Sequence, residues 1–350
     1  MIGILGEVNT LAVVGFGGGL ALGLAARLGR FCTLGAIEDY LYSSDDRRLR
    51  MWLIATAVAI VATQSLIALG GLTPTDSSLL TIAWNPMATV LGGLAFGYGM
   101  ALSGNCGYGA LARLGGGDLR AFVIVFVMAL SAAVVLSGPL ALLRVWAFPV
   151  EEAFAPQGFG TLAERWLGIS PAALGLLLGA GLLALALSSR DMRHSPARIF
   201  WAAIVGLAVA SGWAGTAWVA QVGFAAEPVQ SHSFAAPLAE TLFWGMTASG
   251  TELSFAVGSV LGVLAGAFLG SLRLGHFRWE ACDDPRELRR QMLGAALMGA
   301  GAVVAMGCSI GQGLTAVSLL TYSGPVAVLA IFAGAALGLR QLIEGVMPAE

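Results

Sequence analysis

Two glycine-rich segments place a cysteine in the same local setting, and the two cysteines are 202 residues apart. Both segments follow the pattern G-x-G-x6-C-x2-G, which covers residues 97–109 around Cys106 and residues 299–311 around Cys308. A thiol offers a weak S–H donor and a soft, polarizable surface. These properties suit a sulfur-containing anion better than a hard oxyanion, so the two cysteines are candidates for a substrate path.

Small residues surround both cysteines and favour a break in the helix at each of them. A short second helix after the break would direct free backbone N–H groups and a positive dipole end at a cavity, which suits an anion. The alternative is that each cysteine is only a small apolar residue in a packed helix, but the repeated spacing disfavours it. The residues expected to support the path are Gly104, Asn105, Gly107 and Gly109 near Cys106, and Gly307, Ser309, Gly311 and Gln312 near Cys308.

Two further cysteines lie outside these paired segments. Cys32 is followed three residues later by Gly35, which partly repeats the pattern. It is either a third thiol on the path or an interfacial cysteine after the first apolar stretch, and the spacing alone leaves both open. Cys282 precedes two aspartates, which disfavour a thiolate, so no reactive nucleophile is expected there.

The composition indicates an all-α polytopic membrane protein that forms a single membrane domain over residues 1–350. The chain is 57% hydrophobic and 11% charged, whereas a soluble domain usually has about 25% charged residues. Helices are expected rather than strands, because a backbone that faces lipid must satisfy its own hydrogen bonds. The net charge of −2 gives no basic surface for nucleic acid.

The sequence contains no motif for catalysis, metal binding or nucleotide binding. It has three histidines, no CxxC pair, no Ser-His-Asp set and no phosphate-binding loop. We therefore expect a transporter rather than an enzyme, with no catalytic residues, no metal site and no cofactor.

Hydropathy predicts about nine membrane spans, near residues 10–28, 51–72, 86–104, 119–143, 169–188, 197–222, 252–272, 291–308 and 325–343. The positive-inside rule assigns four arginine clusters to the cytoplasm. The N-terminus then lies outside and the C-terminus inside, in the cytoplasmic (inner) membrane of a bacterium. The clusters contain Arg47, Arg48 and Arg50; Arg113 and Arg120; Arg190, Arg193 and Arg198; and Arg273, Arg278, Arg286, Arg289 and Arg290.

This orientation makes the two cysteine segments antiparallel. The span leading to Cys106 begins outside at residues 85–86, whereas the span leading to Cys308 begins inside at residues 291–292. Opposite directions are the signature of two inverted, pseudo-symmetric repeats with a site near the midplane of the bilayer. We expect halves of about 1–165 and 166–350, with a short re-entrant or interfacial helix at 237–250.

These segments resemble the YeeE/YedE family of sulfur-transport membrane proteins, and the resemblance spans nearly the whole chain. It is carried by residues 30–32, 104–109, 275–280 and 307–314, of which the last segment is the most specific. The resemblance implies thiosulfate uptake, about nine spans with short re-entrant helices, and two repeats that face each other in an hourglass. It also implies three cysteines that pass the anion along through S–H···S contacts, which by motif are Cys32, Cys106 and Cys308.

The sequence therefore predicts an inner-membrane importer of thiosulfate or a related sulfur-containing anion, in contact with the lipid bilayer. The resemblance also implies a possible partner, a small cytoplasmic sulfur carrier similar to TusA. Two alternatives stay open. One is a soft-metal transporter, since thiolates select Cu(I). The other is an intramembrane enzyme that carries a persulfide or transfers sulfur on a cysteine.

Overall fold

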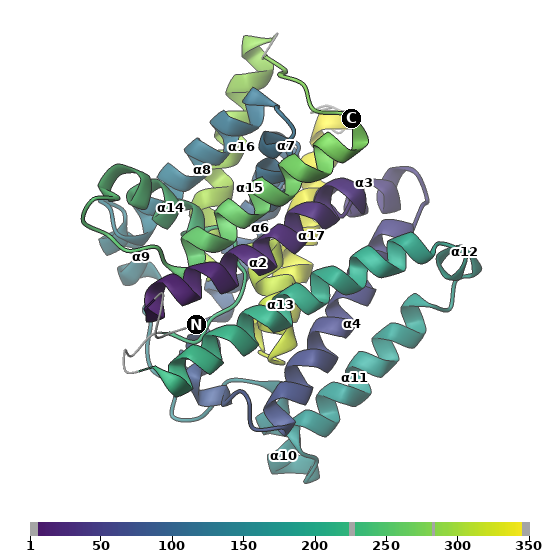
Figure 1. Ribbon diagram of the computed structural model, residues 1–350, viewed down its shortest axis with the longest axis vertical. Helices are drawn as coiled ribbons and strands as arrows, with labels where there is room; N and C mark the ends of the chain where they lie inside the picture. The colour runs from purple at the N-terminus through teal and green to yellow at the C-terminus, as the bar shows by residue number, and fades with distance from the viewer. Residues whose placement is uncertain (1–5, 224–227, 282–283, 345–350) are drawn as a thin grey trace, which may run out of the picture.

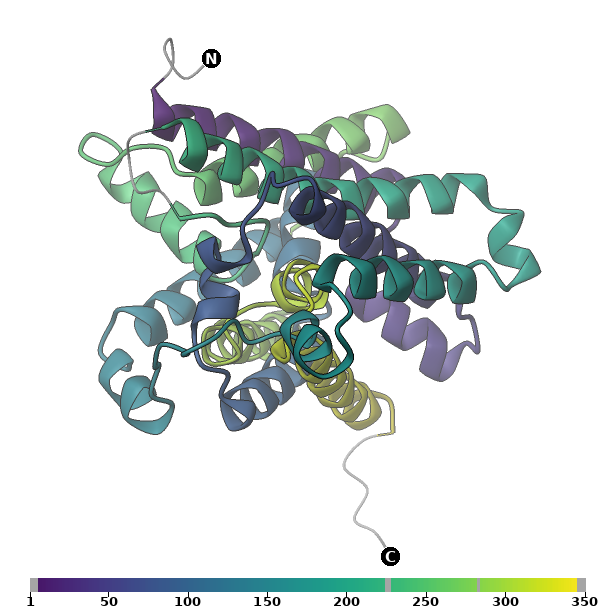
Figure 2. The ribbon, with the colours of Figure 1, turned by 90° about the horizontal axis from the view of Figure 1, so that it is seen from below.

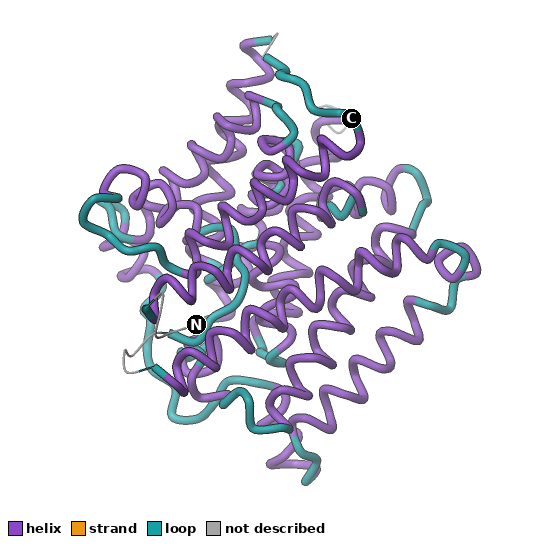
Figure 3. The backbone as a smooth tube through the Cα atoms, in the orientation of Figure 1, coloured by secondary structure: helices purple, strands orange, loops and turns teal. Residues whose placement is uncertain are grey.

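The computed structural model describes residues 6–223, 228–281 and 284–344, which form helices joined by turns and loops (Figure 3). No residue within these ranges belongs to a β-strand. The helical fold expected from the composition is therefore confirmed for the described part of the chain.

The helices of the first half are α2 (Glu7–Leu28), α3 (Thr33–Tyr42), α4 (Arg47–Ala68), the 3₁₀-helix η1 (Pro74–Asp76), α5 (Ser78–Thr81), α6 (Pro86–Ser103), α7 (Gly107–Gly115), α8 (Leu119–Leu136) and α9 (Ala141–Ala147). Those that follow are α10 (Phe159–Leu167), α11 (Pro171–Ala186), α12 (Arg190–Arg193), α13 (Pro196–Val222), α14 (Ala236–Thr247), α15 (Phe255–Leu274), α16 (Pro285–Val304), the π-helix η2 (Gly311–Ala316) and α17 (Ser323–Glu344).

Seven segments of the described chain are long and apolar enough to cross a membrane. They are Glu7–Tyr42, Arg47–Ala68, Pro86–Gly115, Leu119–Leu136, Pro196–Val222, Phe255–Leu274 and Ser323–Ile343. An eighth span results if α10 and α11, which are bent by 114° at a short break, count as one. Each of the nine expected spans coincides with a helix, but α11 has only 16 residues and α16 opens with Arg286, Glu287 and Arg289.

The span expected over residues 119–143 is too long at its C-terminal end. Helix α8 ends at Leu136, and a turn containing Gly138 and Pro139 separates it from α9. Proline has no backbone N–H, and its ring clashes with the preceding turn of a helix. Hydropathy did not detect this break because the residues on both sides of it are apolar.

Glycines allow α2 and α15 to pack with their backbones in close contact (Figure 1). A Cβ atom at Gly19 would collide with the backbone of Ser259, and one at Gly262 would collide with the backbone of Phe16. Small residues at such intervals are typical of closely packed transmembrane helices. The glycines recur every four residues, at Gly15, Gly19 and Gly23 of α2 and at Gly258, Gly262 and Gly266 of α15.

The two G-x-G pairs of the repeated pattern have the same role around α6 and α16. A Cβ atom at Gly99 would collide with the backbone of α16, and one at Gly301 with the backbone of α6. The other glycine of each pair faces a third helix, since Gly97 lies against α17 and Gly299 against α8. Figure 2 shows the yellow α17 beside the blue α6. Each pair thus brings two neighbouring helices close to the helix that carries it.

Two groups of helices lie on either side of the centre of the molecule. Helices α4, α11 and α13 pack together on one flank, and α8, α14 and α16 on the other (Figure 1). Helices α2, α15, α6 and α17 lie between the two flanks in this view. The breaks at the ends of α2, α6 and α16 carry the cysteine segments, which the packing brings together.

Candidate functional site

Each of the three motif cysteines precedes the first turn of a helix and accepts a hydrogen bond from it. Cys32 precedes α3, Cys106 precedes α7, and Cys308 precedes the helical residues 309–318. In all three cases Sγ accepts the backbone N–H of the glycine three positions later, at 3.4 Å. This is the side-chain cap that a helix N-terminus requires for its unpaired N–H groups. The C-x2-G spacing is therefore a capping arrangement, and the expected helix breaks are confirmed.

One threonine hydroxyl connects the three cysteine segments. Thr33 follows Cys32, and its Oγ1 lies 3.8 Å from Sγ of Cys106 and donates to Oγ of Ser309 at 3.2 Å. Ser309 in turn follows Cys308. Residues separated by more than 200 positions in sequence are thus in one hydrogen-bonded cluster. Cys106 and Cys308 are 0% and 2% exposed, whereas Cys32 is partly exposed.

A loop between α13 and α14 completes the surroundings of Cys308. The backbone N–H of Phe234 donates to Sγ of Cys308 at 3.2 Å, and the hydroxyl of Ser233 lies 3.8 Å from the same sulfur. The loop is fixed by Thr315, whose Oγ1 donates to the carbonyl oxygen of His232 at 2.7 Å. Sequence reasoning missed both this loop and Thr33. The sequence carries no local signal for either, because the bonding partner of Thr33 lies 276 residues away and that of Phe234 lies 74 residues away.

The supporting residues near Cys106 form the turn between α6 and α7. Gly104 ends α6 with a φ of 72°, a left-handed conformation that favours glycine. A Cβ atom at Gly107 would lie 2.8 Å from both the sulfur of Met128 and the carbonyl oxygen of Phe234, so the close approach here needs glycine. Asn105 is buried and, together with Gly104 and Gly109, lines a cavity.

The supporting residues near Cys308 close the end of α16. Gln312 donates through Nε2 to the carbonyl oxygens of Ala305 at 2.8 Å and Met306 at 3.1 Å, which the end of the helix leaves without partners. Its Oε1 is buried without a hydrogen-bond partner and the residue lines a cavity. Gly307 donates its N–H to the carbonyl oxygen of Ala302 at 2.8 Å. Gly311 supplies the N–H bound by Cys308.

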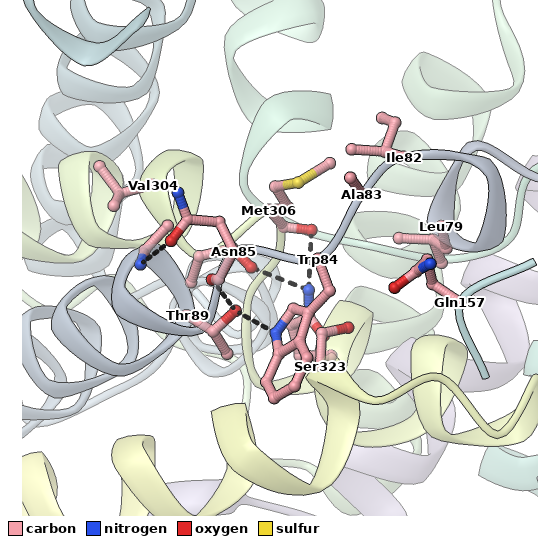
Figure 4. A pocket seen from close by; sticks show the side chains of 13 residues that line it. Leu79, Ile82, Ala83, Trp84, Asn85, Thr89, Gln157, Val304, Met306 and Ser323 are labelled. Atoms are coloured by element: carbon pink, nitrogen blue, oxygen red, sulfur yellow. Dashed lines mark hydrogen bonds between the residues drawn. The ribbon is translucent and has the colours of Figure 1, made fainter. Parts of the chain in front are cut away.

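Cavities lie at both ends of α6. At the start of the helix, a cavity of about 20 Å³ is lined by Asn85 and Arg144, and a neighbouring one of about 40 Å³ is lined by Asn85 and Gln312. Figure 4 shows Trp84 beside the latter, with Nε1 donating to Oγ1 of Thr89 at 3.0 Å. The described residues that line this second cavity are uncharged.

The larger cavity, of about 400 Å³, is lined by Gly104 and Asn105 at the end of α6. Cys32 and four arginines also line it. The two ends of the 18-residue helix are about 27 Å apart at about 1.5 Å per residue, so the cavities are separate.

Among the described residues, no group of three or more His, Cys, Asp or Glu side chains is placed so that it could hold a metal ion. Cys282 lies outside the described residues. What the cysteine cluster offers instead is a set of weak donors, namely thiols, hydroxyls and backbone N–H groups, at the start of three helices.

Comparison with known proteins identifies the family of the chain. A family model described as "Sulphur transport" matches residues 28–337. The chain belongs to this family. The resemblance to YeeE/YedE proteins, drawn from the cysteine motifs, is thereby confirmed.

Two curated proteins are similar to the chain along most of its length. The thiosulfate transporter TsuA of Escherichia coli strain K12 is 25% identical, with 90% of each protein covered. TsuA of Spirochaeta thermophila is also 25% identical, with 90% of this chain and 94% of the relative covered. Family membership and the apolar helices make this chain a multi-pass membrane transporter of the sulphur transport family rather than an enzyme.

Proposed function

We propose that this protein imports thiosulfate, or a related sulfur-containing anion, through a path lined by Cys32, Cys106 and Cys308. The observation that carries the proposal is the cluster in which Thr33 joins the Cys106 segment to the Cys308 segment beside Cys32. The names of the two curated relatives support thiosulfate as the substrate.

The caps prepare the three sulfurs for an anion. Each Sγ already accepts a backbone N–H, so the S–H proton is directed elsewhere and is free to be donated to a passing anion. Each cysteine lies at the N-terminal end of α3, α7 or residues 309–318. This end of a helix dipole is positive, and it stabilises negative charge at the cysteine. A soft terminal sulfur atom on the substrate matches the soft thiol surface better than a hard oxygen does. The hydroxyl of Ser309, which accepts the proton of Thr33, supplies a further donor between the cysteines.

We further propose that the fold consists of two inverted repeats with nine spans, of which α11 and α16 are two. Contacts that recur between the halves support this. The pair α2–α15 corresponds to α13–α4, the pair α6–α17 to α16–α8, and the pair α3–α17 to α14–α8. The expected halves, about 1–165 and 166–350, then share a core of α2–α8 matched to α13–α17. Helices α9–α12 serve as the connection.

In this correspondence the two copies of the cysteine pattern are related by the repeat, whereas Cys32 is not duplicated. Cys32 is the residue before α3, and its counterpart before α14 is Ala235. The path thus has two thiols related by the repeat, Cys106 and Cys308, and one additional thiol, Cys32, on one side of the membrane. With the arginine clusters in the cytoplasm, the N-terminus outside and the C-terminus inside, that side is the cytoplasmic one. A small TusA-like carrier would receive the sulfur species there.

The proposal is tested by thiosulfate uptake into proteoliposomes that contain the purified protein. We expect Cys106→Ser and Cys308→Ser each to abolish uptake while protein yield and unfolding temperature stay near those of the wild type. Cys282→Ser is the matched control, because Cys282 lies in no C-x2-G motif, and it should transport normally. Full uptake by both motif variants would refute the cysteine path. Uptake of sulfate as fast as thiosulfate would refute selection by soft sulfur.

A further inference from the structure

The cavity beside Cys32 has a strongly basic wall that the cysteine path does not explain. It encloses about 400 Å³ and reaches from the surface to Cys32 and Asn105. The wall is formed by the end of α2 with the following turn, by α3, by the start of α4, by α7 with the turn before it, and by the end of α15 with His276. The arginines that line the wall are Arg27, Arg30, Arg48 and Arg113.

Half of this positive charge is not balanced by the carboxylates beside the cavity. Arg48 is paired with Asp39 through Nε at 3.2 Å, and Glu38 is the acidic residue among the lining side chains. Arg27 donates its Nε–H to the hydroxyl of Ser271 at 2.6 Å, a neutral partner. Against four arginines, the carboxylates of Glu38 and Asp39 leave two positive charges in excess.

Other carboxylates nearby are already occupied. Asp118 and Glu280 act electrostatically on Arg27, but both are paired with Arg120, at 3.2 Å and 3.7 Å. Neither Arg30 nor Arg113 forms an ion pair with a described residue. An anion that enters the cavity therefore meets guanidinium groups with free donors, which bind oxyanions through paired N–H···O bonds.

The arginines are also held near the thiol. A Cβ atom at Gly35 would collide with Nη1 of Arg48, and one at Gly116 would collide with the guanidinium of Arg27, so each glycine leaves the space that an arginine occupies. Arg48, Arg113 and Cys32 line the same cavity. Basic groups and the partly exposed thiol thus face one volume.

We propose that this cavity is a binding station for a small sulfur oxyanion with two negative charges, in which Arg30, Arg113 and Arg27 hold the oxyanion end while its sulfur lies against Cys32. The station deepens the proposed function and rests on it for the identity of the anion. Its two excess charges match the charge of thiosulfate. At the other end of α6, one small cavity has no charged lining residue and the one beside it has a single arginine, Arg144, so the positive charge is concentrated at the Cys32 end of the path.

The first test measures whether the cavity attracts anions, and it requires no transport. The purified protein carries Cys282→Ser, and Cys106 and Cys308 are buried, which leaves Cys32 as the accessible thiol among the motif cysteines. Its labelling rate is measured with two methanethiosulfonate reagents, the anionic sulfonatoethyl and the cationic trimethylammonioethyl compound. Both rates are normalised to those of free 2-mercaptoethanol. We expect the anionic reagent to be favoured about tenfold or more, and the preference to shrink as salt is added.

Substitutions test whether the arginines cause the preference of Cys32 for the anionic reagent. Arg30→Gln and Arg113→Gln should each reduce it severalfold, whereas Arg289→Gln, which removes a charge from an exposed position on α16, should leave it unchanged. Calorimetric titration with thiosulfate should show affinity weakened about tenfold by Arg30→Gln and by Arg113→Gln but not by Arg289→Gln. Equal labelling by the two reagents, or an undiminished preference in both cavity variants, would overturn the station even if uptake is normal. A clear preference without any uptake would instead overturn the proposed function.

Discussion

The substitution Gly301→Ala tests whether the G-x-G pairs fix the distance between the helices that carry the cysteines. A Cβ atom at this position of α16 would lie 2.6 Å from the backbone nitrogen of Phe96 and 2.7 Å from the carbonyl oxygen of Gly92, both on α6. Ordinary contacts of a Cβ atom begin at 3.4 Å. Helix α6 must therefore move by the difference, about 0.7–0.8 Å, because backbone atoms cannot rotate away as a side chain can.

The expected cost follows from two opposing effects. Overpacking a close contact destabilises a protein by about 1–3 kcal/mol. Replacing glycine by alanine within a helix has an opposite effect of up to about 1 kcal/mol. Gly17→Ala is the matched control, since Gly17 lies in the middle of α2 with no atom within 4 Å of a Cβ atom. The difference between the two variants isolates the packing cost, which we expect to be about 1–3 kcal/mol.

The assay is reversible unfolding of both variants in mixed micelles with increasing denaturing detergent, followed by thiosulfate uptake. Gly301→Ala should unfold earlier than Gly17→Ala, and its uptake should fall because the shift moves α16 and α6, which lead to Cys308 and Cys106. The reasoning is refuted if Gly301→Ala and Gly17→Ala have the same stability, since the space between α6 and α16 would then not require glycine.

Two further predictions concern the cysteine cluster. Cys106→Ala should lose about 1 kcal/mol of unfolding free energy, because the N–H of Gly109 loses its cap, whereas Cys106→Ser keeps an acceptor and should lose less. Unfolding curves distinguish the two variants, and equal destabilisation would contradict the capping role. Thr33→Val should slow uptake severalfold at unchanged protein yield, because the bond to Ser309 is lost. Thr33→Ser keeps the hydroxyl and should restore the rate, so a rate as low as that of Thr33→Val would argue against that bond.

Much of the fold could be predicted from hydropathy alone. Apolar runs long enough to cross a bilayer must form helices, since lipid offers the backbone no hydrogen-bond partners. Hydropathy did not predict the helix ends where the polarity of the residues does not change at the end of the helix. Pro139 ends α8 inside an apolar run, and the charged start of α16 precedes an apolar remainder. Hydropathy measures transfer into lipid and carries no information on backbone geometry.

The sequence indicated the capping cysteines but not their tertiary contacts. The repeated C-x2-G spacing indicated Cys106 and Cys308 because a cap acts over three residues, which is local and leaves a mark in the sequence. The spacing around Cys32 left its role open. The contacts of Thr33 and Phe234 leave no such mark, since their partners lie 276 and 74 residues away.

What the sequence by itself determined is therefore local: helices from apolar length, breaks from glycine and proline, and sulfur caps from a three-residue spacing. The tertiary structure decided which breaks meet, and so it joined the three cysteine segments through Thr33 and gathered arginines from α2, α4 and α7 around one cavity. The physical reason is the distance along the chain over which each interaction acts. Backbone propensities and caps act within one helical turn, whereas the meeting of distant segments depends on how closely glycine surfaces on separate helices allow the backbones to approach.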